Sequence, residues 1–182
     1  MSASAAWTRL DGPGRDAALL RPVDGGWLLR GAAAFEHDGG AAAVAYQVEV
    51  DARWRTLRGI VSGFVGDKTI QCEIRRDNRG WTLNGAAIEG LGQLVDLDYG
   101  FTPATNVLQL SRVALEPGQR AEVPVAWFDL DSASLIELPQ SYERRGEASY
   151  WYEAPTVPYR ALLEISPSGF VQGYPGLWRL IE

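Results

Sequence analysis

A strict two-residue alternation runs through residues 43–51, AVAYQVEVD. The bulky apolar residues of this stretch are Val44, Tyr46, Val48 and Val50. Successive side chains of an extended strand point to opposite faces of a sheet, so these four side chains share one face. Residues 69–75, TIQCEIR, repeat the pattern. Both segments therefore predict strands of an antiparallel sheet that has one buried face and one solvated face.

Turn signals built on glycine and proline recur at short intervals on both sides of these segments, at residues 37–40, 66–68, 77–80, 84–85, 116–118, 145–146 and 166–169. The segments between them predict further strands at 26–35, 53–65, 81–83, 123–130, 135–144, 149–154, 158–165, 170–174 and 177–181. About ten strands are more than a flat open sheet holds without curling. The predicted fold class is therefore all-β and mainly antiparallel, with a single strongly curved sheet that forms a half-barrel or open barrel.

One segment interrupts the strand pattern, at residues 99–106, YGFTPATN. Thr102 suits a helix N-cap and Pro103 suits the first helical position, so we expect a short helix of one or two turns that plugs or flanks the sheet. The sequence contains no internal repeat and no linker-like stretch. We therefore expect a single domain over residues 1–182, in which residues 1–25 form a partly irregular N-terminal extension.

Composition excludes several classes of function. The chain has 182 residues, 46% of them hydrophobic, and a net charge of −6. Its basic residues, which include the single lysine Lys68, form no run longer than a pair, so we expect neither nucleic acid nor an anionic membrane surface as partner. One cysteine and one histidine, Cys72 and His37, leave little for a soft metal site. Phosphate-binding glycine motifs are missing, so we expect no cofactor.

The distribution of apolar residues bears on cellular location. No stretch approaches the ~18 apolar residues of a membrane span. The first 16 residues have no apolar run and include Asp11, which argues against a secretory signal. We therefore expect a cytoplasmic location and no integral membrane association. The excess of arginine over lysine, with abundant alanine and glycine, favours a bacterial gene of high GC content.

The aromatic content is high, with seven Trp, seven Tyr and five Phe. Each single aromatic residue is explained by ordinary packing, because aromatic side chains favour strands. The whole set exceeds what packing requires, and we expect some of these side chains to line a cavity. Within residues 150–152, YWY, the alternation places Trp151 on one face of the sheet and both tyrosines on the other.

Two carboxylates, Asp96 and Asp98, are separated by one residue and so project to the same side of a strand. Such a pair suits a divalent cation or acid–base chemistry with split pKa values. The structural alternative is that one carboxylate caps the following helix or pairs with Arg112 while the other is solvated. Further polar residues among apolar segments are Asn106, Gln140 and Tyr142. A buried Arg112 needs an anionic partner, for which Asp96 and Asp98 are the candidates.

An ordered set of motifs resembles the bacterial family described as putative glycolipid-binding. These motifs are residues 96–99, 101–108, Arg112, 117–118, 125–127, 140–142, 150–152, 170–171, 174–175 and Trp178. The resemblance runs from about residue 27 to residue 178. Ala104 and residues 109–111 depart from the family's usual residues. The resemblance implies a strongly curved antiparallel sheet with a helical plug, similar to periplasmic lipoprotein carriers and to a small cofactor-free enzyme of indole pigment synthesis.

The first functional hypothesis is therefore a binding protein that holds an amphipathic small molecule, for which the family suggests a glycolipid, on the concave face of the sheet. The expected aromatic wall consists of Trp127, Tyr142, Tyr150, Tyr152 and Trp178. The expected contacts to the polar head are Asn106, Arg112 and Gln140, with Asp96 and Asp98 orienting Arg112. This hypothesis assigns no catalytic residue and no metal ligand.

Two alternatives remain at this point. A small cofactor-free enzyme would use Asp96 and Asp98 with Arg112 on an aromatic or sugar-like substrate, and it requires both carboxylates to be open to the cavity. An interaction scaffold would use exposed aromatic residues for a protein partner, and it predicts an apolar patch on the convex surface and a filled cavity. The sequence does not indicate the oligomeric state.

Overall fold

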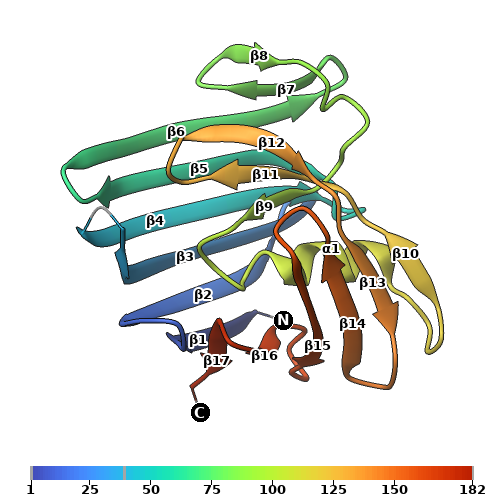
Figure 1. Ribbon diagram of the computed structural model, residues 1–182. Helices are drawn as coiled ribbons and strands as arrows, with labels where there is room; N and C mark the ends of the chain where they lie inside the picture. Colours follow the sequence, from blue (N-terminus) through green and yellow to red (C-terminus); the bar gives the residue numbers. More distant parts are fainter. Residues whose placement is uncertain (1, 39, 182) are drawn as a thin grey trace.

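The structure is a computed structural model that describes residues 2–38 and 40–181. It contains two β-sheets and a short helix (Figure 1). The first strands of the larger sheet are β1 (Ala3–Arg9), β2 (Gly14–Val23), β3 (Gly26–His37), β4 (Gly40–Asp51), β5 (Thr56–Val65), β6 (Lys68–Asp77) and β7 (Gly80–Leu83). Its other strands are β8 (Ala86–Ile88), β10 (Arg120–Glu122), β13 (Ser141–Arg144), β14 (Ser149–Ala154), β15 (Tyr159–Ile165), β16 (Val171–Tyr174) and β17 (Trp178–Leu180).

The strand order of the larger sheet is β10-β13-β14-β15-β16-β17-β1-β2-β3-β4-β5-β6-β7-β8. Most neighbours are consecutive in sequence, and the N-terminal strand β1 pairs with the C-terminal strand β17. Neighbouring strands pair antiparallel, and the ends of the order, β8 and β10, do not pair with each other. The predicted fold class is confirmed: the protein is mainly antiparallel β, with one large sheet that curves without closing into a barrel.

The smaller sheet consists of β12 (Ser134–Leu138), β11 (Val125–Asp129) and β9 (Leu97–Tyr99), in this order. Strands β11 and β12 form a hairpin, whereas β9 and β11 are parallel. The helix α1 (Asn106–Val113) follows β9 directly along the chain. Figure 1 shows these elements in front of the concave side of the large sheet. The expected plug is therefore a helix together with a second sheet.

The alternation that predicted the central strands determines which side chains of the sheet are buried. Val44, Tyr46, Val48 and Val50 are all at most 2% exposed. The Tyr46 ring lies across the inner face at Gly31, where an added Cβ would come within 2.3 Å of the Tyr46 hydroxyl oxygen. Tyr99 of β9 reaches the same sheet and donates a 2.9 Å hydrogen bond to the carbonyl oxygen of Gln47. These contacts join the two sheets into one core.

The elements differ from the sequence expectations at several places. Residues 1–25, expected to be partly irregular, include strands β1 and β2. The expected strand at 135–144 is two strands in different sheets, β12 and β13, and the chain changes sheet at Pro139 and Gln140. The helix begins after Thr105 and not after Thr102, whose hydroxyl oxygen instead accepts a 3.0 Å hydrogen bond from the Ala104 amide within a turn. Within residues 2–38 and 40–181, no helix is long and apolar enough to cross a membrane.

Candidate functional site

The carboxylate pair lies on β9 and just before it, facing the α1 segment. Asp96 accepts a two-pronged ion pair from Arg112 near the end of α1, with N–O distances of 2.8 and 2.7 Å. Asp96 is 2% exposed. Burial raises the pKa of this carboxyl group, and the Arg112 guanidinium opposes that shift. The Arg112 side chain is about a quarter exposed, at 25%, so this pair anchors the end of α1 at the protein surface.

The second carboxylate, Asp98, is bound at the start of the same helix. It accepts a hydrogen bond of 2.5 Å from the hydroxyl of Thr105, the N-cap residue of α1. Burial raises the pKa of Asp98 above its ordinary value, and the side chains of Thr105 and Gln109 oppose that shift. Thr105, Gln109 and Arg112 follow one another at helical spacing, so one side of α1 presents its polar groups to the two carboxylates. The two aspartates therefore both face the α1 segment, but the Asp96 carboxylate is already bound in an ion pair with Arg112.

A buried hydrogen-bond network lies behind Asp98. The Asn106 side-chain amide donates to the Tyr142 hydroxyl at 2.7 Å, and Tyr142 donates to Gln109 Oε1 at 3.0 Å. Gln140 donates to the same Gln109 oxygen at 3.2 Å, and Tyr152 donates to Gln140 Oε1 at 2.7 Å. Among the described residues, no buried side-chain polar atom lacks a hydrogen-bond partner. A fully satisfied network of this kind holds its members in fixed positions.

Above this network lies a cavity of about 260 Å³, which we call the tyrosine chamber. Its polar floor is formed by Asp98, Thr102, Asn106 and Tyr152, and the other lining residues are Tyr99, Gly100, Pro103, Trp127, Leu138, Val157, Tyr159, Tyr174, Leu177 and Trp178. The ring centroids of Tyr152, Tyr159 and Tyr174 lie 5.2–6.1 Å from one another. The chamber therefore combines convergent polar groups with broad aromatic faces.

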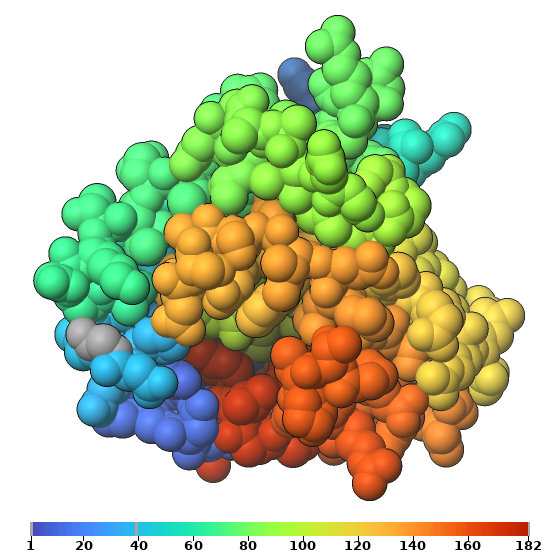
Figure 2. All heavy atoms as spheres, turned by 45° about the horizontal axis from the view of Figure 1, so that its top comes forward, coloured from blue at the N-terminus to red at the C-terminus, as the bar shows by residue number. Residues whose placement is uncertain are grey.

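A second cavity of about 170 Å³ adjoins the first, and we call it the carboxylate chamber. It is lined by Arg9, Asp11, Phe35, His37, Gly100, Phe101, Trp127, Phe128, Asp129, Leu130, Asp131, Leu177 and Trp178. The two chambers are neighbours, because both are lined by Gly100, Trp127, Leu177 and Trp178. Figure 2 shows the surface hollowed beneath the β11–β12 hairpin, with the red C-terminal segment at depth.

Gly100 shapes the boundary that the two chambers share. A Cβ at this position would lie 2.6 Å from the Trp127 indole, so the ring packs directly on the glycine backbone. Trp127 and Asp98 are register partners on the parallel strands β11 and β9. The small sheet therefore places one aromatic face and one carboxyl group side by side at the junction of the chambers.

Comparisons with known proteins support the resemblance seen in the sequence. The family described as putative glycolipid-binding matches residues 4–180, nearly the whole chain. The chain belongs to the putative glycolipid-binding family. A comparison with curated proteins finds no match. The crystal structure of a DUF1089 family protein from Pseudomonas aeruginosa has a TM-score of 0.79 with this chain, at 24% sequence identity and 91% coverage of both chains. This likeness shows a shared fold.

In this member of the putative glycolipid-binding family, the expected site residues fall into two groups. Five of them line the tyrosine chamber: Asp98, Asn106, Trp127, Tyr152 and Trp178. The others, Asp96, Arg112, Gln140, Tyr142 and Tyr150, line neither chamber. Gln140 and Tyr142 support the floor from behind through the buried network. The acid–base alternative requires two open carboxylates, and the cavity contains only Asp98 of that pair.

The remaining chamber residues had no predicted role in the site. Arg9 and His37 come from strands β1 and β3, and Asp131 follows β11. Tyr159 and Tyr174 come from β15 and β16. These residues share no local motif, and only the pairing of distant strands brings them together. The high aromatic content was the available signal, and it indicated a cavity without indicating its members.

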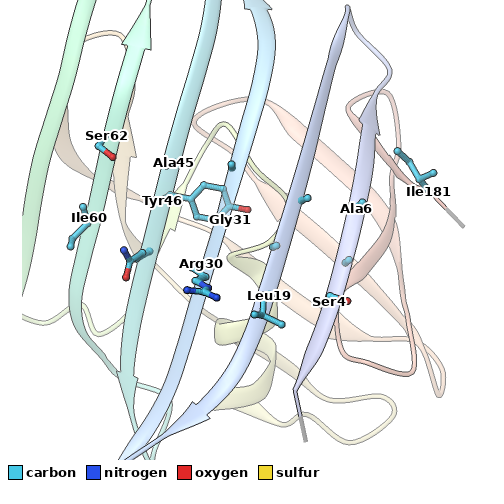
Figure 3. Close-up of a pocket in the computed structure, with 15 residues that line it drawn as sticks. Ser4, Ala6, Leu19, Arg30, Gly31, Ala45, Tyr46, Ile60, Ser62 and Ile181 are labelled. Carbon is cyan, nitrogen blue, oxygen red and sulfur yellow. The ribbon is translucent and has the colours of Figure 1, made fainter.

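A larger hollow, of about 790 Å³, lies on the outer face of the sheet (Figure 3). Its floor is a cross-strand row of small residues, Ala6, Ala17, Ala32, Ala45 and Ser62, which the strand registers bring side by side. Leu19, Arg30 and Ile60 stand along one edge of this row. The hollow has polar lining residues, Ser4, Arg30, Gln47 and Ser62, but it is more open to solvent than the two chambers. Because small-molecule sites are concave and enclose most of their ligand, we place the candidate site in the two chambers on the opposite, concave side.

Proposed function

We propose that this protein binds an amphipathic small molecule of the glycolipid type, with the hydroxylated ring of the ligand in the tyrosine chamber. The observation that carries the proposal is the convergence of Asp98, Asn106 and Tyr152 on one floor beneath aromatic walls. A site of this kind, mostly aromatic with a few placed polar groups, is the usual form of a small-molecule site.

The walls suit a sugar ring because tyrosine and tryptophan combine a flat apolar body with one polar atom. Trp127 is partly exposed, and its indole lies beside Asp98. Burial raises the pKa of Tyr159 to about 12 and also raises the pKa of Tyr174, so both phenols stay protonated near neutral pH. Neutral phenol groups can donate to sugar hydroxyls and accept hydrogen bonds from them.

The apolar part of the ligand has a place at the mouth of the chamber. Val157, in the turn between β14 and β15, is 43% exposed, and Leu177 is partly buried at the same opening. Each chamber is smaller than the ~300 Å³ at the lower end of drug-sized sites, so each holds one part of a molecule. An alkyl chain therefore runs outward over Val157 and Leu177 while the ring lies on the floor.

The test is calorimetric titration with octyl β-glucoside below its micelle concentration, comparing Tyr152→Phe with the matched control Tyr150→Phe. Both tyrosines are buried on β14, but only Tyr152 lines the chamber. Removal of the Tyr152 hydroxyl takes one polar group from the chamber floor, so we expect affinity to fall about five- to tenfold, equivalent to ~1 kcal/mol. Tyr150→Phe should bind as the wild type does. Equal affinities in all three proteins, or no binding to any, would overturn the proposal.

A further inference from the structure

The carboxylate chamber carries an excess of negative charge that its own cation does not balance. Its lining includes three carboxylates, Asp11, Asp129 and Asp131, one guanidinium, Arg9, and the imidazole of His37. Arg9 is bound to Asp11 through two hydrogen bonds of 2.7 and 2.9 Å, and it also donates to the Glu36 carbonyl oxygen. Arg9 and Asp11 neutralise each other, so Asp129 and Asp131 supply the net negative charge of the chamber.

These two carboxylates are held by local contacts at the end of β11. Asp129 accepts hydrogen bonds from the Asp131 amide and the Ser132 hydroxyl, which fixes the turn into β12. Asp131 is hydrogen-bonded to His37 Nε2 at 2.6 Å. This contact joins the end of β3 in the large sheet to the small sheet across the chamber. The Asp131 side chain is 68% exposed, so its carboxylate also remains open to solvent.

The opposite walls of the same chamber are aromatic. Phe35, Phe101, Trp127 and Trp178 all contribute to the lining. The Arg9 guanidinium lies 5.0 Å from the ring centroid of Phe35 and 5.9 Å from that of Trp178. Two of these walls therefore already contact a cation. Aromatic faces combined with carboxylates are the surroundings in which proteins hold an ammonium group.

We propose that the carboxylate chamber is a subsite for an ammonium group on the ligand whose ring occupies the tyrosine chamber. This inference rests on the proposed function. The two chambers share the lining residues Gly100, Trp127, Leu177 and Trp178, and the proposed ligand reaches from the tyrosine chamber past these residues into the carboxylate chamber. An ammonium group on the ligand lies between the aromatic walls and the carboxylates of Asp129 and Asp131. An anionic group in the same position is repelled.

An amino sugar and a phosphocholine head both supply an ammonium group, so the test includes one amphiphile of each kind. The central comparison is octyl β-glucosaminide against octyl β-glucoside, which differ in one amine. Titrations are done at low ionic strength and near neutral pH, because a more acidic solution would favour protonation of the imidazole beside Asp131. We expect the glucosaminide to bind about tenfold more tightly, a ratio that falls as salt is added. Octylphosphocholine is the third ligand, and the tighter of the two ammonium amphiphiles identifies the source.

The variant Asp131→Asn removes one charge and keeps the shape of the side chain. Because this carboxylate is largely exposed, we expect the glucosaminide preference to fall about threefold. The control is Asp67→Asn, which makes the same charge change at an exposed turn between β5 and β6. Its preference should equal that of the wild type.

Three outcomes overturn the inference. In the first, the glucoside binds and the glucosaminide binds no better, which rejects the ammonium subsite and leaves the proposed function intact. In the second, Asp131→Asn and Asp67→Asn lower the preference equally, which assigns the effect to net charge. In the third, no amphiphile binds, which rejects the subsite together with the proposed function.

Discussion

Among the single residues, Asp16 joins the large sheet to the segment that carries α1. Its carboxyl group is 2% exposed and accepts hydrogen bonds from the Tyr46 hydroxyl, at 2.9 and 3.0 Å, and from the Thr102 hydroxyl. Burial raises its pKa from 3.8 to about 6, and the hydroxyl donors oppose part of that shift. Since Thr102 also lines the tyrosine chamber, the charge state of Asp16 bears on the position of the chamber floor.

This raised pKa predicts a stability that falls as pH rises. The folded state holds the Asp16 proton more tightly than the unfolded state, so its contribution is complete below about pH 4 and is lost as pH passes about 6. The rise in the pKa of Asp16 from 3.8 to about 6 corresponds to ~3 kcal/mol. Denaturant unfolding at acidic and neutral pH should show a smaller decline in Asp16→Asn than in the wild type. An identical decline in both proteins would contradict this account.

Because Arg112 is paired with the buried Asp96 carboxylate, we expect removal of Arg112 alone to lower the free energy of unfolding strongly. Arg112→Ala leaves a carboxylate that is 2% exposed without its partner, and we expect a loss of ~3 kcal/mol in the free energy of unfolding. Arg112→Lys should lose less, because it keeps the charge but not the two-pronged geometry. Because Arg112 lines neither chamber, amphiphile affinity in Arg112→Lys should match the wild type. Unchanged stability in Arg112→Ala would show that the pair contributes nothing.

Among the secondary-structure elements, the contact between β11 and the loop after β9 forms part of the boundary that the two chambers share. Gly100→Ala would place a methyl group within 2.6 Å of the Trp127 indole, so the ring must move. We expect a shifted tryptophan emission spectrum and about tenfold weaker binding of octyl β-glucoside, comparable to the loss of one well-placed contact. The control is Gly92→Ala, because a Cβ there would contact nothing within 4 Å. Wild-type binding by Gly100→Ala would show that the indole position does not matter.

Local sequence could predict some of the secondary-structure elements and not others. Alternation correctly predicted β4 and β6, since their period of two is a local property. It did not predict β1, whose sequence ASAAWTR is rich in small residues and which is held between β2 and β17. The helix starts at Asn106 because Thr105 is bound to Asp98 on β9, a tertiary contact that the Thr-Pro signal at 102–103 does not contain.

For the molecule as a whole, the candidate site forms where three parts of the chain meet. The small sheet contributes Asp98 and Trp127, strands β14 to β17 contribute the tyrosines and Trp178, and β1 and β3 contribute Arg9 and His37. Sequence motifs identified the first two parts, because the family's signature lies there. The third part depends on β17 pairing with β1, which brings the two ends of the chain together.

The curved sheet has two hollowed faces, and a ligand would contact different residues on each of them. The outer face offers a shallow row of alanines, whereas the concave side offers convergent polar groups under aromatic rings. A crystal structure of the protein soaked with octyl β-glucosaminide distinguishes the two most directly. We predict the sugar ring within hydrogen-bonding distance of Asp98, Asn106 and Tyr152, with its amine directed past Trp127. A ligand seated on the outer alanine row, or a tyrosine chamber left empty at saturating ligand, would contradict the account.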